Sequence, residues 1–155
     1  MNIINNQNFI TNIQLTKILA LLSNQYMPHN LIICECRKDV FRLYKFIKPI
    51  DYLLTILDMT ILFGKVEGIN YIEQDIIIIY IFAQDYEEYD NQDKQLYSLH
   101  ALFHEARHRW QKLTNYVGDE EKDADYFATT YINKNSKKIS KIMNWADEWE
   151  VEEED

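Results

Sequence analysis

The pentapeptide His104-Glu105-Ala106-Arg107-His108 is the feature that most restricts how this chain can fold. Residues four apart on an α-helix are rotated by only about 40° from each other. Two histidines at this spacing therefore project from one helical face, where both imidazoles can bind one metal ion. The intervening glutamate can then reach a water on that metal. The pattern requires a helix here and predicts a zinc site of the hydrolytic type.

The surrounding residues support a helix over 93–114, because this stretch contains no Gly or Pro. Apolar residues recur at helical spacing and predict one buried stripe: Leu99, Phe103, Ala106, Trp110 and Leu113. The polar side chains His100, His104, His108 and Gln111 fall on a neighbouring face. A rigid element packed on a core would thus carry the two candidate ligands.

A catalytic two-histidine zinc site needs a third protein ligand and one open position for water. Glu121 is the best candidate, because it opens a second helical pattern just after a helix break expected at Gly118. Asp119 and Glu120 are rival ligands, and Glu121 could instead be an ordinary carboxylate at a helix N-terminus. Asp125 lies four residues beyond Glu121, where it could accept the spare ring N–H of a ligand histidine or simply face solvent.

Other polar residues near the motif have less certain roles. His100 lies one turn before His104 and could line a cleft, or it could be a hydrogen-bonded structural histidine. Tyr97 and Tyr116 could donate to an oxyanion, but with eleven tyrosines in the chain the sequence singles out neither.

The combination of HEARH with a downstream ExxxD in a DADYFA setting resembles the gluzincin zinc peptidases. Within them it is similar to the compact ImmA/IrrE-like type of bacterial and phage-related genomes. The resemblance covers residues 96–132. It implies that His104, His108 and Glu121 bind zinc, that Glu105 is the general base and that Asp125 orients His104. The chain departs from that family in having Arg107 before the second histidine and Thr-Thr-Tyr-Ile at residues 129–132.

Length and composition predict a single domain over residues 1–146 and an acidic tail over residues 147–155. The net charge of −9 argues against direct nucleic-acid binding. The tail itself is typical of a solvating end, or it could contact a basic partner or cover the site. Cys34 and Cys36 are too close in sequence for an ordinary disulfide and predict reduced, buried thiols.

The longest wholly apolar run, residues 76–83, is too short to span a bilayer, and no stretch near the N-terminus resembles a secretion signal. We therefore expect a cytoplasmic protein without membrane contact. The sequence carries no signal for a particular oligomeric state.

Periodicity predicts an amphipathic helix between Ile10 and Leu22 after a frayed, Asn-rich start over residues 1–8. Strands are expected at residues 31–37, 40–48 and 76–83, with a tight connection at Lys38-Asp39, whereas residues 51–63 fit a strand or a helix. Residues 133–138 suggest a polar linker before a last amphipathic helix that reaches Trp149.

This order of elements predicts an α+β fold, with a small, mostly antiparallel sheet packed on the HEARH helix. The resemblance to the gluzincins implies that this is a minimal zincin-like metallopeptidase fold. Because residues 76–83 are closest in sequence to the motif, this strand could be the edge on which an extended substrate docks. The alternative is a central, buried strand, which its apolar character also favours.

The sequence thus predicts a zinc-dependent intracellular peptidase that hydrolyses a peptide bond with Glu105 as general base. By analogy with the family that it resembles, the substrate would be one specific protein partner. The alternative is a non-catalytic, zinc-stabilised binding or regulatory module of mobile-element origin.

Overall fold

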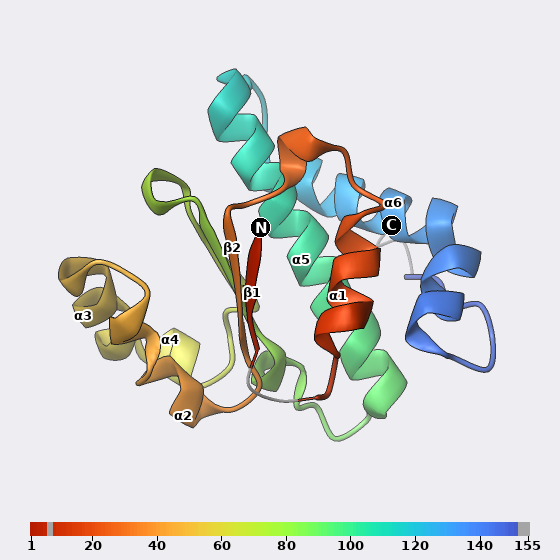
Figure 1. Ribbon diagram of the computed structural model, residues 1–155, viewed down its shortest axis with the longest axis horizontal. Coiled ribbons are helices and arrows are strands. Elements are labelled where there is room, and N and C mark those ends of the chain that lie inside the picture. The colour runs from red at the N-terminus through yellow and green to blue at the C-terminus, as the bar shows by residue number, and fades with distance from the viewer. Residues whose placement is uncertain (6–7, 152–155) are drawn as a thin grey trace.

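Two helical layers enclose a four-stranded sheet in the computed structural model, which describes residues 1–5 and 8–151 (Figure 1). The strands are β1 (Asn2–Ile4), β2 (Asn30–Cys34), β3 (Gly68–Tyr71) and β4 (Ile76–Tyr80). The helices are α1 (Asn12–Leu19), α2 (Arg37–Val40), α3 (Pro49–Leu57), α4 (Met59–Leu62), α5 (Asn91–Thr114) and α6 (Glu120–Met143). The predicted α+β class is confirmed.

The sheet is mixed and mostly parallel, so the predicted antiparallel arrangement is wrong. Its strand order is β1-β2-β4-β3; β1 and β2 pair in parallel, as do β2 and β4, and only β3 runs antiparallel to its neighbour. The error comes from the expected hairpin between residues 31–37 and 40–48. The chain instead leaves β2 into helices and returns to the sheet at the edge strand β3, from which a short connection leads into β4, parallel to β2.

Residues 40–48 form no strand. The tight turn expected at Lys38-Asp39 is the start of α2, where the Asp39 Oδ2 atom accepts the backbone N–H groups of Glu35 and Cys36, each at 3.1 Å. A 3₁₀ turn, Leu43–Lys45, follows. Exposed Phe41 and Tyr44 gave this segment its strand-like composition. Residues 51–63, which fitted either structure, are helical in α3 and α4.

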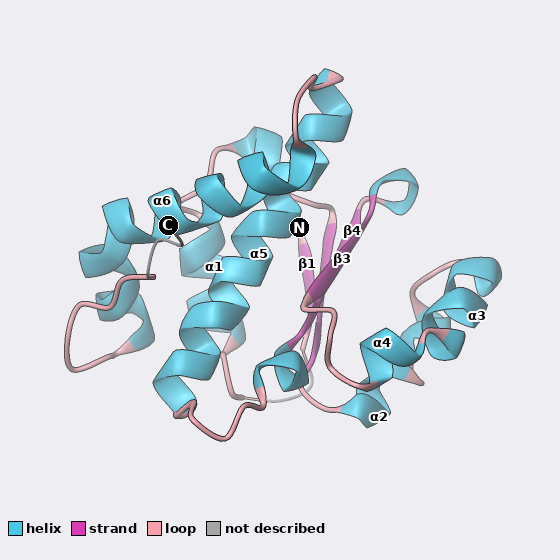
Figure 2. Ribbon diagram, turned by 180° about the vertical axis from the view of Figure 1, so that it is seen from behind, coloured by secondary structure: helices cyan, strands magenta, loops and turns pink. Residues whose placement is uncertain are grey.

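Alternate residues of the two central strands supply two separate cores. One core lies between the sheet and helices α1, α5 and α6 and contains Leu31, Ile33, Ile77 and Ile79. Figure 2 shows the helical layers on the two sides of the sheet. Ile32, Cys34, Ile76, Ile78 and Tyr80 pack with the other layer, residues 37–63, which we call the α2–α4 lobe. β4 is therefore a buried, central strand, which was the alternative that its apolar sequence favoured. It ends at Tyr80, and a 3₁₀ turn, Ile81–Gln84, follows. The edge strand on that side is β3.

Helix α6 runs without interruption across residues 133–138, so the linker predicted there is wrong. Within the polar stretch that suggested a linker, Ser136 is buried on the inner face of the helix, in series with Ile132, Ile139 and Ser140. The helix ends at Met143, because Asn144 adopts the left-handed conformation with φ 62°. The predicted last helix to Trp149 is therefore the final turn of α6 followed by an irregular segment.

Both ends of the described chain contact the domain. Asn2–Ile4, expected to fray, forms β1, while residues 6–7 lie outside the described residues. Val151 is buried, and its backbone N–H and C=O bond to the Asn133 side chain at 2.8 and 3.0 Å. The domain boundary at residue 146 stays a prediction, because residues 152–155 of the acidic tail lie outside the described residues.

The two cysteines are unpaired thiols, as predicted. Cys34 is buried, which raises the pKa of its thiol, whereas Cys36 is half-buried. Among the described residues, no helix combines the length and the apolar character needed to cross a bilayer.

Candidate metal centre

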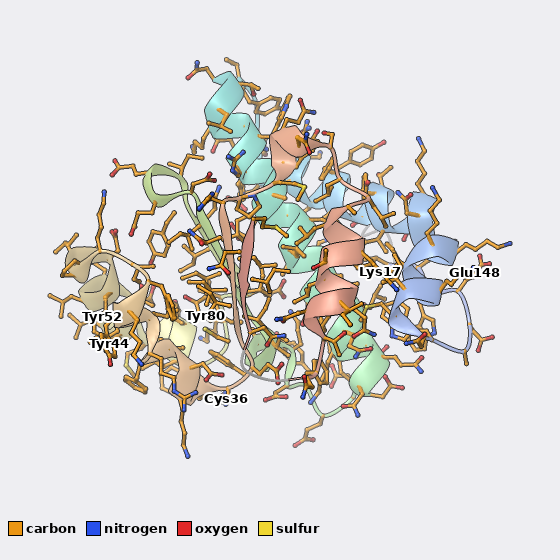
Figure 3. The ribbon with its side chains drawn as sticks, in the orientation of Figure 1. Lys17, Cys36, Tyr44, Tyr52, Tyr80 and Glu148 are labelled. Carbon is orange, nitrogen blue, oxygen red and sulfur yellow. The ribbon has the colours of Figure 1, made fainter. Side chains whose placement is uncertain are left out.

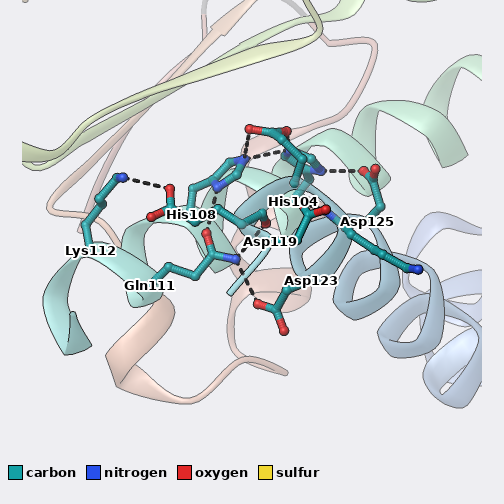
Figure 4. Close-up of polar contacts among 10 residues, drawn as sticks. His104, His108, Gln111, Lys112, Asp119, Asp123 and Asp125 are labelled. Carbon is teal, nitrogen blue, oxygen red and sulfur yellow. Dashed lines mark hydrogen bonds and ion pairs between the residues drawn. The ribbon is translucent and has the colours of Figure 1, made fainter. Parts of the chain in front are cut away.

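Helix α5 carries both histidines of the motif on a well-anchored element. It begins at the N-cap residue Asp90, whose side chain accepts the backbone N–H groups of Gln92 and Asp93, and it ends at left-handed Asn115. Its buried stripe includes Leu99, Phe103 and Ala106. The adjoining face turns toward the N-terminal half of α6, where the polar side chains of the two helices meet (Figure 4).

His104, His108 and Glu121 come together at this junction, and one ligand atom from each lies within 4.8 Å of the others. The two Nε2 atoms are 2.8 Å apart, and each is 3.4 Å from a carboxylate oxygen of Glu121. The predicted helix break positions the glutamate, since α5 ends at Thr114 and α6 begins at Glu120. These three residues form a group that could hold a metal ion.

The two rival third ligands are engaged elsewhere. Asp119 is the N-cap residue of α6 and accepts the backbone N–H of Lys122 at 3.2 Å. Glu120 points back to α5 and pairs with Lys112 at 2.7 Å. Of the three neighbouring carboxylates, Glu121 is therefore the one that faces both histidines, and it does so while 77% exposed. A ligand that retains this exposure leaves one side of the group open to a substrate.

The hydrogen-bond partners of the two imidazole rings indicate which ring nitrogens are available to bind a cation. The Nδ1 atom of His104 lies 2.7 Å from the Asp125 carboxylate, and Nδ1 of His108 lies 2.8 Å from Oε1 of Gln111. The amide of buried Gln111 is oriented by its NH₂ group, which donates to the carbonyl of Glu120 and to Asp123, each at 2.8 Å. Both Nδ1 atoms thus face acceptors and carry the protons of the neutral rings.

The consequence is that both Nε2 lone pairs converge with a carboxylate oxygen. Three acceptors this close repel one another unless a proton or a metal cation lies among them. Two imidazole nitrogens and a carboxylate oxygen are the donor set of His₂Glu zinc sites, and outer partners that hold the rings are their usual accompaniment. The residues present therefore fit zinc. Asp125 lies where the sequence suggested, whereas the contact of Gln111 with His108 was missed.

Arg107 supplies a second link between the helices that the sequence did not reveal. Its guanidinium binds the Asp123 carboxylate at 2.7 and 3.0 Å, donates to the Tyr26 hydroxyl at 3.0 Å and lies 3.9 Å above the Trp110 ring. This planar, two-point contact holds α6 in register with α5 and lowers the pKa of Asp123. Arg107, which departs from the gluzincin-like pattern, thus joins α5 to α6 beside the candidate metal group.

The side chain of Glu105 lies against β3. The residue is 9% exposed and lines a pocket of about 180 Å³ together with Glu67, Gly68, His100, Ala101, His104 and Asp125. Burial raises the pKa of the Glu105 carboxyl to about 7. The nearby charge of His108 lowers this pKa, whereas the charges of Glu121 and Glu67 raise it. The strand approaches so closely that a Cβ atom on Gly68 would lie 2.7 Å from Cγ of Glu105. Gly68 is therefore needed for β3 to lie against this glutamate.

His100 lines the same pocket and bonds to the Thr129 hydroxyl at 3.1 Å. Burial, with a smaller contribution from His104, lowers the pKa of His100 to about 4. Its position is compatible with the cleft role and with the structural role. Neither Tyr97, which stacks on Tyr89, nor Tyr116, which packs near Trp110, is among the residues that line the pocket.

Comparisons with protein-family models, with curated proteins and with solved structures find no match to this chain. The group formed by α5 and α6 is therefore the feature of this chain that indicates a function.

Proposed function

We propose that this protein is a zinc-dependent peptidase. The observation that carries the proposal is the convergence of the lone pairs of His104 and His108 with the carboxylate of Glu121 beside a buried glutamate. The assignment to the gluzincins, the zincin-like character of the fold and the identity of the metal are parts of this proposal.

Each residue has a distinct role in the proposed reaction. His104, His108 and Glu121 would hold the zinc ion, which when bound supplies Lewis-acid polarisation of the scissile carbonyl and lowers the pKa of a water to about 7. Glu105 accepts the proton of the attacking water and later donates it to the leaving amine. A pKa of about 7 suits a group that must both accept and donate a proton. Asp125 and Gln111 hold the ligand rings and fix their tautomers.

The substrate is proposed to dock on β3, which replaces residues 76–83 as the candidate edge. β3 pairs with β4 on one side only, and its first residue, Gly68, lines the pocket beside Glu105. An extended peptide could add to this edge through main-chain hydrogen bonds. That the substrate is one protein partner is an inference by analogy with the family that the motif resembles.

The test compares wild-type protein with Glu105→Gln in cells, by mass spectrometry of newly formed protein N-termini. Glu105 is not among the proposed ligands, so its replacement should leave zinc bound while the rate falls by several orders of magnitude. Cleavage products found with the wild type and missing with Glu105→Gln are the expected result.

The non-catalytic module, the alternative function, predicts a different outcome. Both proteins would then bind zinc and the same partner, and the cleavage patterns would be identical in a host that contains that partner. Such a result would overturn the peptidase proposal and leave the metal centre in place.

A further inference from the structure

Helix α3 turns its apolar side to the solvent. Ile50, Leu53, Leu54 and Leu57 follow the i, i+3, i+4, i+7 spacing of one helical face, and their exposed fractions lie between 47% and 66%. A helix on the surface of a monomer normally turns such a stripe toward the core. We call these four residues the α3 stripe.

The opposite side of α3 faces the domain, where Tyr52 and Ile56 pack on the core beside a set of polar contacts. Buried Thr55 donates to the carbonyl of Asp51, and its hydroxyl lies 2.7 Å from that of Tyr71 in β3. The Asp51 carboxylate accepts the side-chain N–H of Gln74 at 2.7 Å. Turning the helix over would bury the leucines but would remove these polar contacts. The outward direction of the stripe is therefore fixed by specific hydrogen bonds.

More apolar surface surrounds the stripe on the same lobe. Phe41, Tyr44, Met59 and Phe63 are each at least half exposed, and the lobe forms the end of the molecule farthest from α6 (Figures 1 and 3). Eight large side chains, each roughly half exposed, present several hundred Å² of apolar surface, more than scattered exposure in a monomer requires. A surface of this size is on the order of one side of a standard protein interface.

The charges at the ends of α3 indicate what covers the stripe. Lys48 is the N-cap residue, at the positive end of the helix dipole, and its ammonium also pairs with Glu73 of the same chain at 3.0 Å. Asp58 lies at the other end, between Leu57 and Met59. Hydrogen bonds from the Thr60 hydroxyl and backbone N–H lower the pKa of Asp58, so this carboxylate stays charged. A charged carboxylate amid the apolar residues opposes insertion into an anionic bilayer. It suits a second α3 running in the opposite direction, whose Lys48 would lie opposite Asp58.

We propose that the α3 stripe is the contact surface of a two-fold symmetric homodimer in which the two α3 helices pack antiparallel. In such a pair the same patch is used by both copies. Ile50 of one copy then meets Leu57 of the other, and the centre of symmetry lies between Leu53 and Leu54. Lys48 of each copy approaches Asp58 of the other, so both ends of the contact are charge-complementary. The proposal is independent of the metal centre.

The first test is sedimentation equilibrium of the full chain over a wide concentration range. Leu54→Lys should weaken dimerisation by at least roughly 100-fold, because each dimer buries two copies of this leucine. The matched control is Ile13→Lys in α1, where an apolar side chain is 69% exposed outside the lobe. It should leave the dimer unchanged.

The second test reads the antiparallel register from disulfide formation, in a Cys36→Ser background that leaves only buried Cys34. Leu54→Cys lies near the symmetry centre and should cross-link to itself. Ile50→Cys should not, since two copies of residue 50 lie about seven residues, or roughly 10 Å, apart along the helix axis. An equimolar mixture of Ile50→Cys and Leu57→Cys should cross-link.

Several outcomes would overturn the proposal. A monomer at all concentrations would do so, as would equal weakening by Leu54→Lys and Ile13→Lys. Self-cross-linking of Ile50→Cys but not of Leu54→Cys would contradict the antiparallel pairing. Cosedimentation with phosphatidylglycerol vesicles by a chain that stays monomeric, lost in Leu54→Lys, would assign the stripe to a membrane surface instead.

Discussion

On the α5–α6 side of the sheet, polar side chains are buried and bind one another, whereas on the α2–α4 side apolar side chains of α3 face the solvent. His108 and Gln111 are held by at least one partner each inside the first region. Leu54 and Leu57 in the second region are more exposed than buried. Buried polar groups and exposed apolar patches are the two departures from ordinary globular structure that carry functional information.

The difference shows how one small sheet can support two kinds of surface. Hydrogen bonds with fixed directions, such as those of Asp125 and Gln111, orient the imidazole rings of His104 and His108. The apolar stripe of α3 has no such directional contacts of its own and is suited to association with another surface.

The ligand assignment predicts a sharp ranking among adjacent carboxylates. Glu121→Ala should weaken zinc binding by more than the roughly 100-fold that loss of an outer partner causes, because a ligand is removed. Glu120→Ala should be near neutral, since Glu120 pairs with Lys112 on the exposed side of the junction. Competition titrations with a zinc chelator measure both affinities. A larger effect at Glu120 would move the third ligand to that residue.

Asp125 should have an intermediate effect, because it orients His104 without touching the metal. Asp125→Ala is expected to weaken zinc binding by roughly 10–100-fold. Asp125→Asn keeps an acceptor for the ring N–H and should recover part of that loss in the same chelator titration. An affinity unchanged in Asp125→Ala would show that the hydrogen bond does not hold the ring.

Ion pairs in the two regions should differ in their contribution to stability. Arg107→Met leaves a half-buried Asp123 without its two-point partner and should lower the free energy of unfolding by about 2 kcal/mol. Glu73→Gln breaks an exposed pair with Lys48 near α3 and should cost under about 1 kcal/mol. Urea denaturation of the metal-free variants measures both. Equal losses would mean that the two regions are not held differently.

His100 should make the stability of the metal-free protein depend on pH. Its pKa is lowered to about 4 in the folded state from 6.5, so the unfolded chain binds the proton more readily between these values. Stability is therefore complete above pH 6.5 and falls as the pH drops toward 4, by on the order of 2 kcal/mol from this residue. His100→Gln should flatten that part of the profile in urea titrations at several pH values. An unchanged profile would remove His100 as the cause.

The metal group could be predicted from the sequence because local periodicity determines it. His104 and His108 share a face at any position on a helix, and the break before Glu120 brings the next helix back beside them. Gln111 could be placed on the same face, but its contact with His108 depends on the side-chain hydrogen bonds made across α6. Arg107 gave no signal, because its partner Asp123 belongs to a helix whose packing the sequence does not specify.

The sheet was harder to predict because pairing direction depends on non-local connections. Residues 40–48 have the composition of a strand, yet the capping contacts of Asp39 start a helix there, and this choice makes β2 and β4 parallel. Similarly, Ser136 and Ser140 appear polar in sequence but are small enough to be buried where α6 packs on the core. Tertiary context overrides composition at each of these positions.

The most direct test of the metal centre is the zinc content of the purified protein, measured by elemental analysis of chains never exposed to nickel resin. The account predicts about one zinc per chain in the wild type, the same in His29→Ala, whose histidine is exposed and lies outside the group, and little or none in His104→Ala. Full zinc content in His104→Ala, or a wild type that binds no zinc when it is supplied, would contradict it.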